Sequence, residues 1–203
     1  MKKSVWLFIL VCLYLIFVCW YAKAEPAASL KYRSILVREA HVVYGLDAPI
    51  PMFAGQIHQE SHWRANVTAW DDGRGLAQFM DGTAQFIAVK YPELGRPDPY
   101  NPVWATRALV RLNSYNYARV KGVDDCQKWG AALKGYNAGL GYVQQAQRKS
   151  SAPGVWFGVT EFTPTRQSKK NFEYSRLYPR WIIFKHQPLY TGWGRVVCEG
   201  VKP

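Results

Sequence analysis

Proline, glycine and helix-capping residues divide the chain after residue 25 into short helical segments, and this punctuation is the strongest constraint on its fold. Asn101-Pro102 is typical of an N-cap followed by proline at the first helical position. Gly45 and Gly139 are placed to end helices. The predicted helices cover residues 28–44, 51–61, 81–91, 101–121, 124–139, 142–149 and 167–185, the last with Pro179 as a potential break.

The segments between these helices are predicted to be loops. Residues 62–74 are polar and rich in turn formers, and Asp81 or Thr83 then offers a cap for the next helix. Residues 151–165 are irregular, and we expect a short hairpin or a flap there. No repeat and no β-α-β alternation occurs, and 203 residues suit one domain. The sequence therefore predicts a mostly α, single compact helical domain.

The first 24 residues are typical of a secretory signal peptide. Lys2 and Lys3 precede an apolar run from Val5 to Ala22, and Ala22-Lys23-Ala24 fits a small-x-small cleavage site. The run is nearly long enough to span a bilayer, so an uncleaved N-terminal anchor is the alternative. The expected location is the periplasm or the exterior, with attachment to the inner membrane if the leader stays on.

Cys12 and Cys19 lie in this leader, which leaves Cys126 and Cys198 in the mature chain. An even pair in an oxidising compartment predicts a disulfide, which would tie a C-terminal tail of residues 191–203 to the body. Two unpaired buried thiols are the alternative. Two cysteines are too few for a structural zinc site without histidine ligands.

The mature chain is predicted to be strongly basic. Loss of residues 1–24 removes three lysines and no acid, so the formal net charge of +12 becomes +9. A basic exported protein is attracted to polyanions, which in a bacterial envelope include peptidoglycan carboxylates, teichoic acids and lipid head groups. We expect no nucleic-acid partner, because no nucleic-acid motif occurs and the chain is exported.

A carboxylate interrupts the apolar face of the segment 54–61. Phe53, Ile57 and Glu60 are spaced i, i+4 and i+7, so they share one side of a helix. Burial disfavours the charged form of a carboxyl group and raises its pKa. A general acid that works near neutral pH needs a pKa of that kind. An ordinary surface glutamate is the alternative interpretation.

Four motifs then follow in order: Glu60-Ser61, GLAQF at 75–79, GYNAG at 135–139 and YPRWI at 178–182. Together they resemble the soluble lytic transglycosylase (SLT-type) domain of the lysozyme-like superfamily, a relative of goose-type lysozymes. That family has Glu-Ser, GLMQ with a Pro-Gly-Thr-Ala-like turn, AYNAG, and a tyrosine near the end. The resemblance covers roughly residues 30–185 and implies an α+β lysozyme-like fold with a substrate groove. The catalytic domain would span residues 25–190.

Three positions depart from the family pattern, and none of them removes a polar functional group. Ala77 stands where methionine is usual, Asp81 where proline is usual, and Gly135 where alanine is usual. The fourth motif leaves two choices for the tyrosine. Tyr178 is preferred to Tyr174 because the residues after it continue a helical apolar face.

The resemblance implies a lytic transglycosylase that cleaves the MurNAc–GlcNAc β-1,4 bond of peptidoglycan and leaves 1,6-anhydro-muramic ends. Glu60 would protonate the leaving oxygen and then take the proton of the sugar 6-hydroxyl, without a second carboxylate and without a cofactor. Ser61 would hydrogen-bond near the Glu60 carboxylate. Substrate binding would fall to Ser61, Gln78, Tyr136, Asn137 and Tyr178. Gln78 and Asn137 are neutral amides that donate and accept without adding charge.

Three other interpretations compete with this one. His58 and His62 at i and i+4 suggest zinc, but Glu60 lies about 200° round the helix from His58 at 3.6 residues per turn, so we expect no metal. We expect the histidines to face solvent or substrate. A goose-type muramidase would need Asp71, Asp72 or Asp81 as a second carboxylate, and those in the loop are interpreted as turn residues.

The third alternative is a non-catalytic peptidoglycan-binding envelope protein. The expected partners are peptidoglycan glycan strands, with a potential association with the envelope or a secretion machinery. We expect a monomer.

Overall fold

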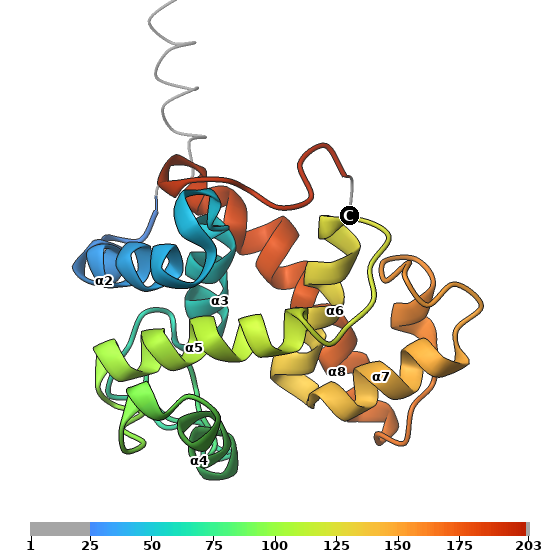
Figure 1. The fold of residues 1–203 in the computed structure, drawn as a ribbon, viewed down its shortest axis with the longest axis horizontal. Coiled ribbons are helices and arrows are strands. Elements are labelled where there is room, and N and C mark those ends of the chain that lie inside the picture. Colours follow the sequence, from blue (N-terminus) through green and yellow to red (C-terminus); the bar gives the residue numbers. More distant parts are fainter. Residues whose placement is uncertain (1–24, 202–203) are drawn as a thin grey trace, which may run out of the picture.

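The structure, a computed structural model, describes residues 25–201, and the predicted leader and the last two residues lie outside this range. The mostly α, single-domain prediction is confirmed (Figure 1). Seven α-helices are described: α2 (Ala27–Tyr44), α3 (Ile50–Ser61), α4 (Asp81–Lys90), α5 (Pro102–Tyr117), α6 (Asp125–Ala138), α7 (Leu140–Lys149) and α8 (Lys169–Arg180). Shorter helical turns are η1 (Gly45–Asp47), η2 (Pro92–Leu94), η3 (Thr160–Phe162), η4 (Trp181–His186) and η5 (Gln187–Trp193).

Side-chain N-caps open two of the helices, and the one predicted at Asn101 is confirmed. Asn101 Oδ1 accepts from the Val103 backbone N–H at 3.0 Å, and Pro102 opens α5. Asp124 Oδ1 accepts from the Gln127 backbone N–H at 2.8 Å and caps α6, which ends at Gly139 with φ +97°. These caps could be predicted because all the atoms that form them lie within three residues.

Two expectations about helix ends are wrong. Neither Asp81 nor Thr83 caps α4, which begins after Met80 with no side-chain cap. Asp81 instead pairs with Arg74 at 2.6 Å, across the preceding loop. α5 ends at Tyr117, earlier than predicted.

The irregular segment 151–165 contains the turn η3 and no hairpin. It is held to α8 by Glu161, whose side chain is fully buried and accepts two hydrogen bonds from the Arg180 guanidinium, at 2.6 and 2.9 Å. Two isolated β-bridges, Thr68 with Arg74 and Arg74 with Phe79, are the β pairing found within residues 25–201.

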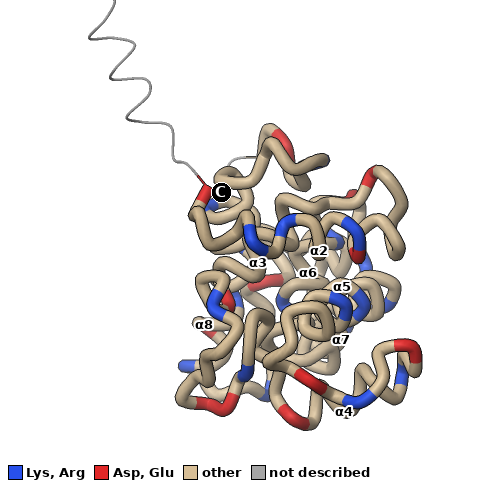
Figure 2. Tube along the Cα trace, turned by 90° about the vertical axis from the view of Figure 1, so that its left-hand side faces the viewer, with Lys and Arg blue, Asp and Glu red and all other residues tan. Residues whose placement is uncertain are grey.

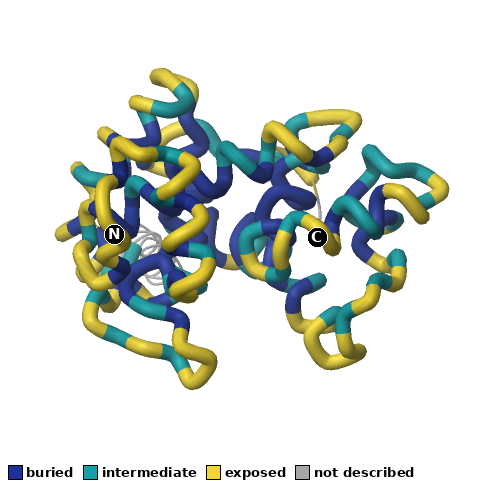
Figure 3. Tube along the Cα trace, turned by 60° about the horizontal axis from the view of Figure 1, so that its bottom comes forward, coloured by how far each residue is buried: buried dark blue, intermediate teal, exposed yellow. Residues whose placement is uncertain are grey.

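α3 is the buried centre of the fold. Every residue from Ile50 to Ile57 is buried, and the helix packs against α2, η4 and η5. Gly55 marks the closest approach, because a Cβ there would lie 2.8 Å from the Gln187 backbone nitrogen of η5. Figure 3 shows the buried segments along the middle of the molecule, with exposed loops around them.

α8 continues through Pro179 and widens into the π-helical turn η4, so the potential break at Pro179 does not occur. α8 packs along α6, which brings the residues just before Pro179 next to the end of α6. π-helical turns are frequent at functional sites. Here the turn begins at Trp181, three residues after Tyr178.

The C-terminal segment folds back over the body. The predicted Cys126–Cys198 disulfide is present and links the first turn of α6 to this segment. Trp193 and Val197 are buried against the rest of the core. Figure 2 shows lysines and arginines spread over several helices. No helix between residues 25 and 201 is long and apolar enough to cross a membrane.

Candidate active site

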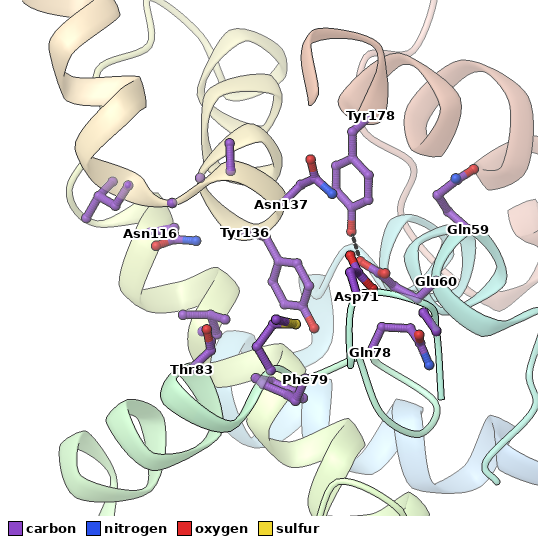
Figure 4. Close-up of a pocket in the computed structure, with 18 of the residues that line it drawn as sticks. Gln59, Glu60, Asp71, Gln78, Phe79, Thr83, Asn116, Tyr136, Asn137 and Tyr178 are labelled. Atoms are coloured by element: carbon purple, nitrogen blue, oxygen red, sulfur yellow. Dashed lines mark hydrogen bonds between the residues drawn. The ribbon is translucent and has the colours of Figure 1, made fainter. Parts of the chain in front are cut away.

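A cleft of about 570 Å³ opens between the C-terminal end of α3, the loop 69–80, α4, α5 and the facing parts of α6 and α8 (Figure 4). Five of the six predicted site residues line it, and they come from segments far apart in the sequence: Glu60, Gln78, Tyr136, Asn137 and Tyr178. The sixth, Ser61, does not line it.

Glu60 lies near the end of α3, on the same face as the fully buried Phe53 and Ile57. Its side chain points into the cleft (Figure 4). Burial raises the pKa of the Glu60 carboxyl to about 8, the hydrogen bond from Tyr178 opposes this rise, and the charge of Asp71 adds to it. At neutral pH this carboxyl group therefore carries its proton.

Tyr178 of α8 donates a hydrogen bond from its hydroxyl group to Glu60 Oε1. It is 1% exposed, whereas Tyr174, one turn earlier, is 53% exposed and packs edge-on against Trp181. Both tyrosines line the cleft. Of the two, only Tyr178 is hydrogen-bonded to the carboxyl group among the described residues.

Tyr136 and Asn137 enter the cleft from the last turn of α6. The Tyr136 hydroxyl donates to the Ala77 carbonyl oxygen at 2.7 Å, and burial beside Glu60 raises the pKa of this phenol well above its usual range. The bond ties α6 to the loop that carries Gln78. Neutral groups therefore surround the carboxyl group on this side.

Gln78 has a φ of +50°, and its Nε2 donates to the Gly75 carbonyl oxygen at 2.7 Å. Much of its amide is therefore committed to holding its own loop. Gly75 itself cannot carry a side chain, since its φ is +71° and a Cβ would lie 1.8 Å from the Pro99 carbonyl oxygen. The GLAQF motif thus fixes a tight loop at the cleft wall.

Ser61 does not make the contact with the Glu60 carboxylate that was expected of it. Its side chain is fully buried, and its Oγ donates back to the Ile57 carbonyl oxygen at 3.4 Å instead of reaching the Glu60 carboxylate. Adjacent residues on a helix point about 100° apart, so Ser61 faces the core while Glu60 faces the cleft.

Asp71 lies in the cleft beside Glu60, at a position interpreted from the sequence as a turn (Figure 4). The turn exists: the Asp72 backbone N–H donates to the Ala69 carbonyl oxygen at 3.1 Å, and Asp72, with φ +67°, stays outside the cleft lining. Among residues 25–201, Glu60 and Asp71 are the carboxylates that line this cleft. No local pattern signals this, because the loop has to fold back onto α3 first.

Aromatic and apolar side chains that the motifs did not indicate complete the cleft. Met80, Phe86 and Tyr115 line one part of it, and Trp70 stands in the loop next to Asp71. Trp70 is 93% exposed, while Trp63, Trp104, Trp129, Trp156 and Trp193 are buried. Trp70 differs from these five tryptophans in its exposure, which the sequence does not show.

The histidines lie away from the cleft. His58 Nδ1 is hydrogen-bonded to the Tyr190 hydroxyl at 2.9 Å and its ring lies 4.3 Å from that of His186, so His58 faces η4 and η5 and not solvent or substrate as expected. His62 is exposed. Within the described residues, no group of three or more His, Cys, Asp or Glu side chains is placed to hold a metal ion.

Residues 37–156 match the family model of the Transglycosylase SLT domain. The chain is 29% identical over 137 residues to the membrane-bound lytic murein transglycosylase F of Shewanella halifaxensis, a match that covers 66% of this chain and 28% of the relative. Proteins of the same name from Shewanella pealeana and Vibrio vulnificus are 29% identical over 127 residues and 30% identical over 130 residues. These matches cover 61% and 62% of this chain, and 25% and 23% of the relatives. The chain therefore spans about a quarter of the length of these curated relatives.

Proposed function

We propose that this chain, which belongs to the Transglycosylase SLT domain family, is a lytic transglycosylase that cleaves the MurNAc–GlcNAc β-1,4 bond of peptidoglycan. The observation that carries the proposal is the Glu60 carboxyl group, protonated at neutral pH by burial and hydrogen-bonded by Tyr178 inside a cleft. A glycosidic bond breaks when its leaving oxygen receives a proton as positive charge develops on the sugar. Glu60 is the group in the cleft that holds such a proton.

The second half of the proposed reaction uses the same residue. Once Glu60 has given up its proton it is a carboxylate, and the Tyr178 hydroxyl stabilises that charge. The carboxylate then takes the proton of the muramic 6-hydroxyl group, whose oxygen bonds to C1. The product is a 1,6-anhydro end, and no water is consumed. One residue that acts first as acid and then as base returns to its starting state.

The surrounding side chains are proposed to bind the glycan. Asn137 and Gln78 offer amides at the wall, the Tyr178 hydroxyl contacts the acid, and the Tyr136 hydroxyl lies in the same cleft. Trp70 offers an exposed indole face at the cleft, of the kind that stacks on the apolar face of a sugar ring. No cofactor is required for any of these steps.

A second candidate, hydrolysis by a muramidase mechanism, is favoured by one observation: Asp71 is a second carboxylate in the cleft. In an inverting mechanism such a group activates a water molecule, and in a retaining one it attacks the sugar. Either route ends in a reducing muramic end. The products therefore distinguish the two candidates.

The test is mass spectrometry of the products released from purified sacculi. The transglycosylase proposal expects 1,6-anhydro-muramic ends from the wild type, none from Glu60→Gln, and continued anhydro products from Asp71→Asn. Reducing ends without anhydro products, lost in Asp71→Asn, would establish hydrolysis instead. If the wild type binds sacculi but cleaves no glycan, the protein is a non-catalytic peptidoglycan-binding protein.

The proposed setting is the bacterial envelope. The relatives carry "membrane-bound" in their names, and the leader predicted at residues 1–24 would export this chain to the periplasm, with or without retention as an anchor. The net positive charge suits a peptidoglycan partner that carries carboxylates. Association with an envelope or secretion machinery and a monomeric state are proposed on the same basis.

A further inference from the structure

We infer that Gln56 and Asn113 are positioning residues that fix the direction of the hydrogen bond between Tyr178 and Glu60. The inference rests on the proposed function, because that function gives the Tyr178–Glu60 bond its catalytic role. The contacts that carry the inference lie behind the cleft. Neither Gln56 nor Asn113 lines the cleft, and neither belongs to the four motifs.

Four side chains form a continuous hydrogen-bonded chain from α5 to the cleft. Asn113 Nδ2 donates to Gln56 Oε1 at 2.7 Å, and Gln56 Nε2 donates to the Tyr178 hydroxyl at 3.1 Å. The Tyr178 hydroxyl donates in turn to Glu60 Oε1. Gln56 lies one helical turn before Glu60 on α3, so both of their side chains reach the same tyrosine.

A backbone carbonyl sets the direction of this chain. Asn113 Nδ2 also donates to the Leu109 carbonyl oxygen at 2.9 Å. A carbonyl oxygen only accepts, so the nitrogen of the Asn113 amide and not its oxygen has to lie on that side. That nitrogen also faces Gln56, which turns the Gln56 oxygen toward Asn113 and the Gln56 nitrogen toward Tyr178.

The consequence concerns the single hydrogen of the Tyr178 hydroxyl. Because its oxygen accepts from Gln56, the hydrogen is left for Glu60. A tyrosine held as a donor stabilises the carboxylate that forms when Glu60 gives up its proton. Hydrogen bonds in a chain also polarise one another, so the Gln56 contact strengthens the one that follows.

The arrangement costs stability, which argues against a packing role alone. Gln56 and Asn113 are both 0% exposed, and Asn113 Oδ1 has no hydrogen-bond partner among the described residues. Apolar side chains of similar size would fill this interior without an unpaired oxygen. A buried series of hydrogen-bonded side chains with an unpaired oxygen calls for an explanation, and a function that requires a fixed direction of donation provides one.

The main test is Gln56→Met, studied in the folded full chain. Two quantities are measured: the pKa of Glu60 by carboxyl ¹³C titration, assigned with Glu60→Gln, and the pH profile of kcat on glycan strands. We expect the pKa of Glu60 to rise. The pH at which kcat falls off on the alkaline side of its profile should move to a higher value with it. We expect kcat to fall on the order of tenfold, as for other supporting residues of active sites, with KM within about twofold. The titratable groups that face Glu60 are retained in this variant: Asp71, Tyr136, Tyr174 and Tyr178.

A matched control separates this effect from a general loss of stability. Gln147 is a second buried glutamine, whose Nε2 donates to the Lys121 and Pro153 carbonyl oxygens at 2.8 and 2.9 Å, outside the cleft lining. Gln147→Met should lower the melting temperature and leave the pKa of Glu60 and the pH profile unchanged.

Two further variants keep the test decisive if Gln56→Met does not fold. Gln56→Leu has no polar atom to donate to the Tyr178 hydroxyl, so it should produce the same rise in the Glu60 pKa as Gln56→Met. Asn113→Leu removes only the anchor and should produce a smaller rise.

An unchanged Glu60 pKa and pH profile in the folded variants would overturn the inference. Absence of any glycan product from the wild type would instead refute the proposed function, while the titration would still decide the direction of the hydrogen bonds.

Discussion

At the residue scale, Glu60 combines a folded-state pKa of about 8 with a usual value of 4.5. Between these values the folded carboxyl group holds a proton that the unfolded chain has released, so this group's contribution to stability falls as pH rises from 4.5 to 8. Glu60→Gln should therefore unfold at the same free energy as the wild type near pH 4 and be more stable, by up to about 5 kcal/mol, above pH 8. Denaturant titrations across this range provide the measurement.

The exposed Glu173, on the surface of α8, supplies the control for that experiment. The difference in unfolding free energy between Glu173→Gln and the wild type should stay constant between pH 4.5 and 8. A Glu60→Gln variant as pH-dependent as the wild type would contradict the protonated carboxyl group.

Trp70 is the tryptophan that lines the cleft, and its side chain is almost fully exposed. Its loop is braced by the Ala69 N–H to Gly73 carbonyl bond of 2.8 Å, so the indole is presented from a fixed backbone. Trp70→Ala should raise KM for glycan strands about fivefold, which is the loss of about 1 kcal/mol of aromatic contact, and leave kcat nearly unchanged. Trp70→Phe should retain most of the affinity.

The matched variant is Phe162→Ala, which removes an aromatic ring that is 53% exposed and lies outside the cleft lining. Its KM should equal that of the wild type. Equal KM values in Trp70→Ala and Phe162→Ala would mean that Trp70 does not contact the glycan.

At the element scale, the α6–α8 contact contains a lysine that has no carboxylate partner within residues 25–201. Lys134 of α6 is 3% exposed and donates to Ser175 Oγ of α8. Burial lowers the pKa of this ammonium group to about 8, with a smaller effect of Arg176. Between pH 8 and 10.5 the folded group is neutral while the unfolded one is still charged, so its contribution to stability rises with pH.

Lys134→Met should therefore stabilise the fold at pH 7 by roughly 1–3 kcal/mol and flatten the change in stability between pH 8 and 10.5. Ser175 keeps its bond to the Asn171 carbonyl oxygen at 2.5 Å, so no hydroxyl group is stranded. The exposed Lys149 of α7 provides the comparison, because Lys149→Met should change neither quantity. Loss of stability in Lys134→Met would show that the charge contributes favourably.

Helix caps show how far local sequence predicts an element. The cap at Asn101 could be predicted because cap and helix are neighbours in the chain, as they also are at Asp124. Asp81 was misassigned because its partner, Arg74, is reached only after the loop 62–74 has turned back. The course of α8 through Pro179 also depends on packing, here against α6.

At the scale of the whole molecule, the Cys126–Cys198 disulfide closes a loop with a sequence separation of 72 residues. It holds the segment that buries Trp193 and Val197 against the core. The double variant Cys126→Ser with Cys198→Ser should lose about 4 kcal/mol of unfolding free energy in the chain-entropy model. Denaturant unfolding of wild type and variant, each without reductant, measures the difference.

The cleft lies apart from this link, since neither cysteine lines it. The double variant should therefore keep its pH profile while it loses stability. Addition of reductant should destabilise the wild type and leave the variant unchanged, and equal stability of the two proteins before reduction would contradict the prediction.

The helical class, the cap at Asn101, the cysteine pair and the candidate acid could be predicted from the sequence, because these follow from neighbours, periodicity or a count. Tertiary structure alone decided that Tyr178 and not Tyr174 contacts Glu60, that Ser61 turns to the core, and that Asp71 and Trp70 reach the cleft. It also joined Gln56 to Asn113, 57 residues apart in the chain. These contacts join segments that only the packing of α3, α5, α6 and α8 brings together, and burial, which sets the pKa of Glu60, exists only once that packing has formed.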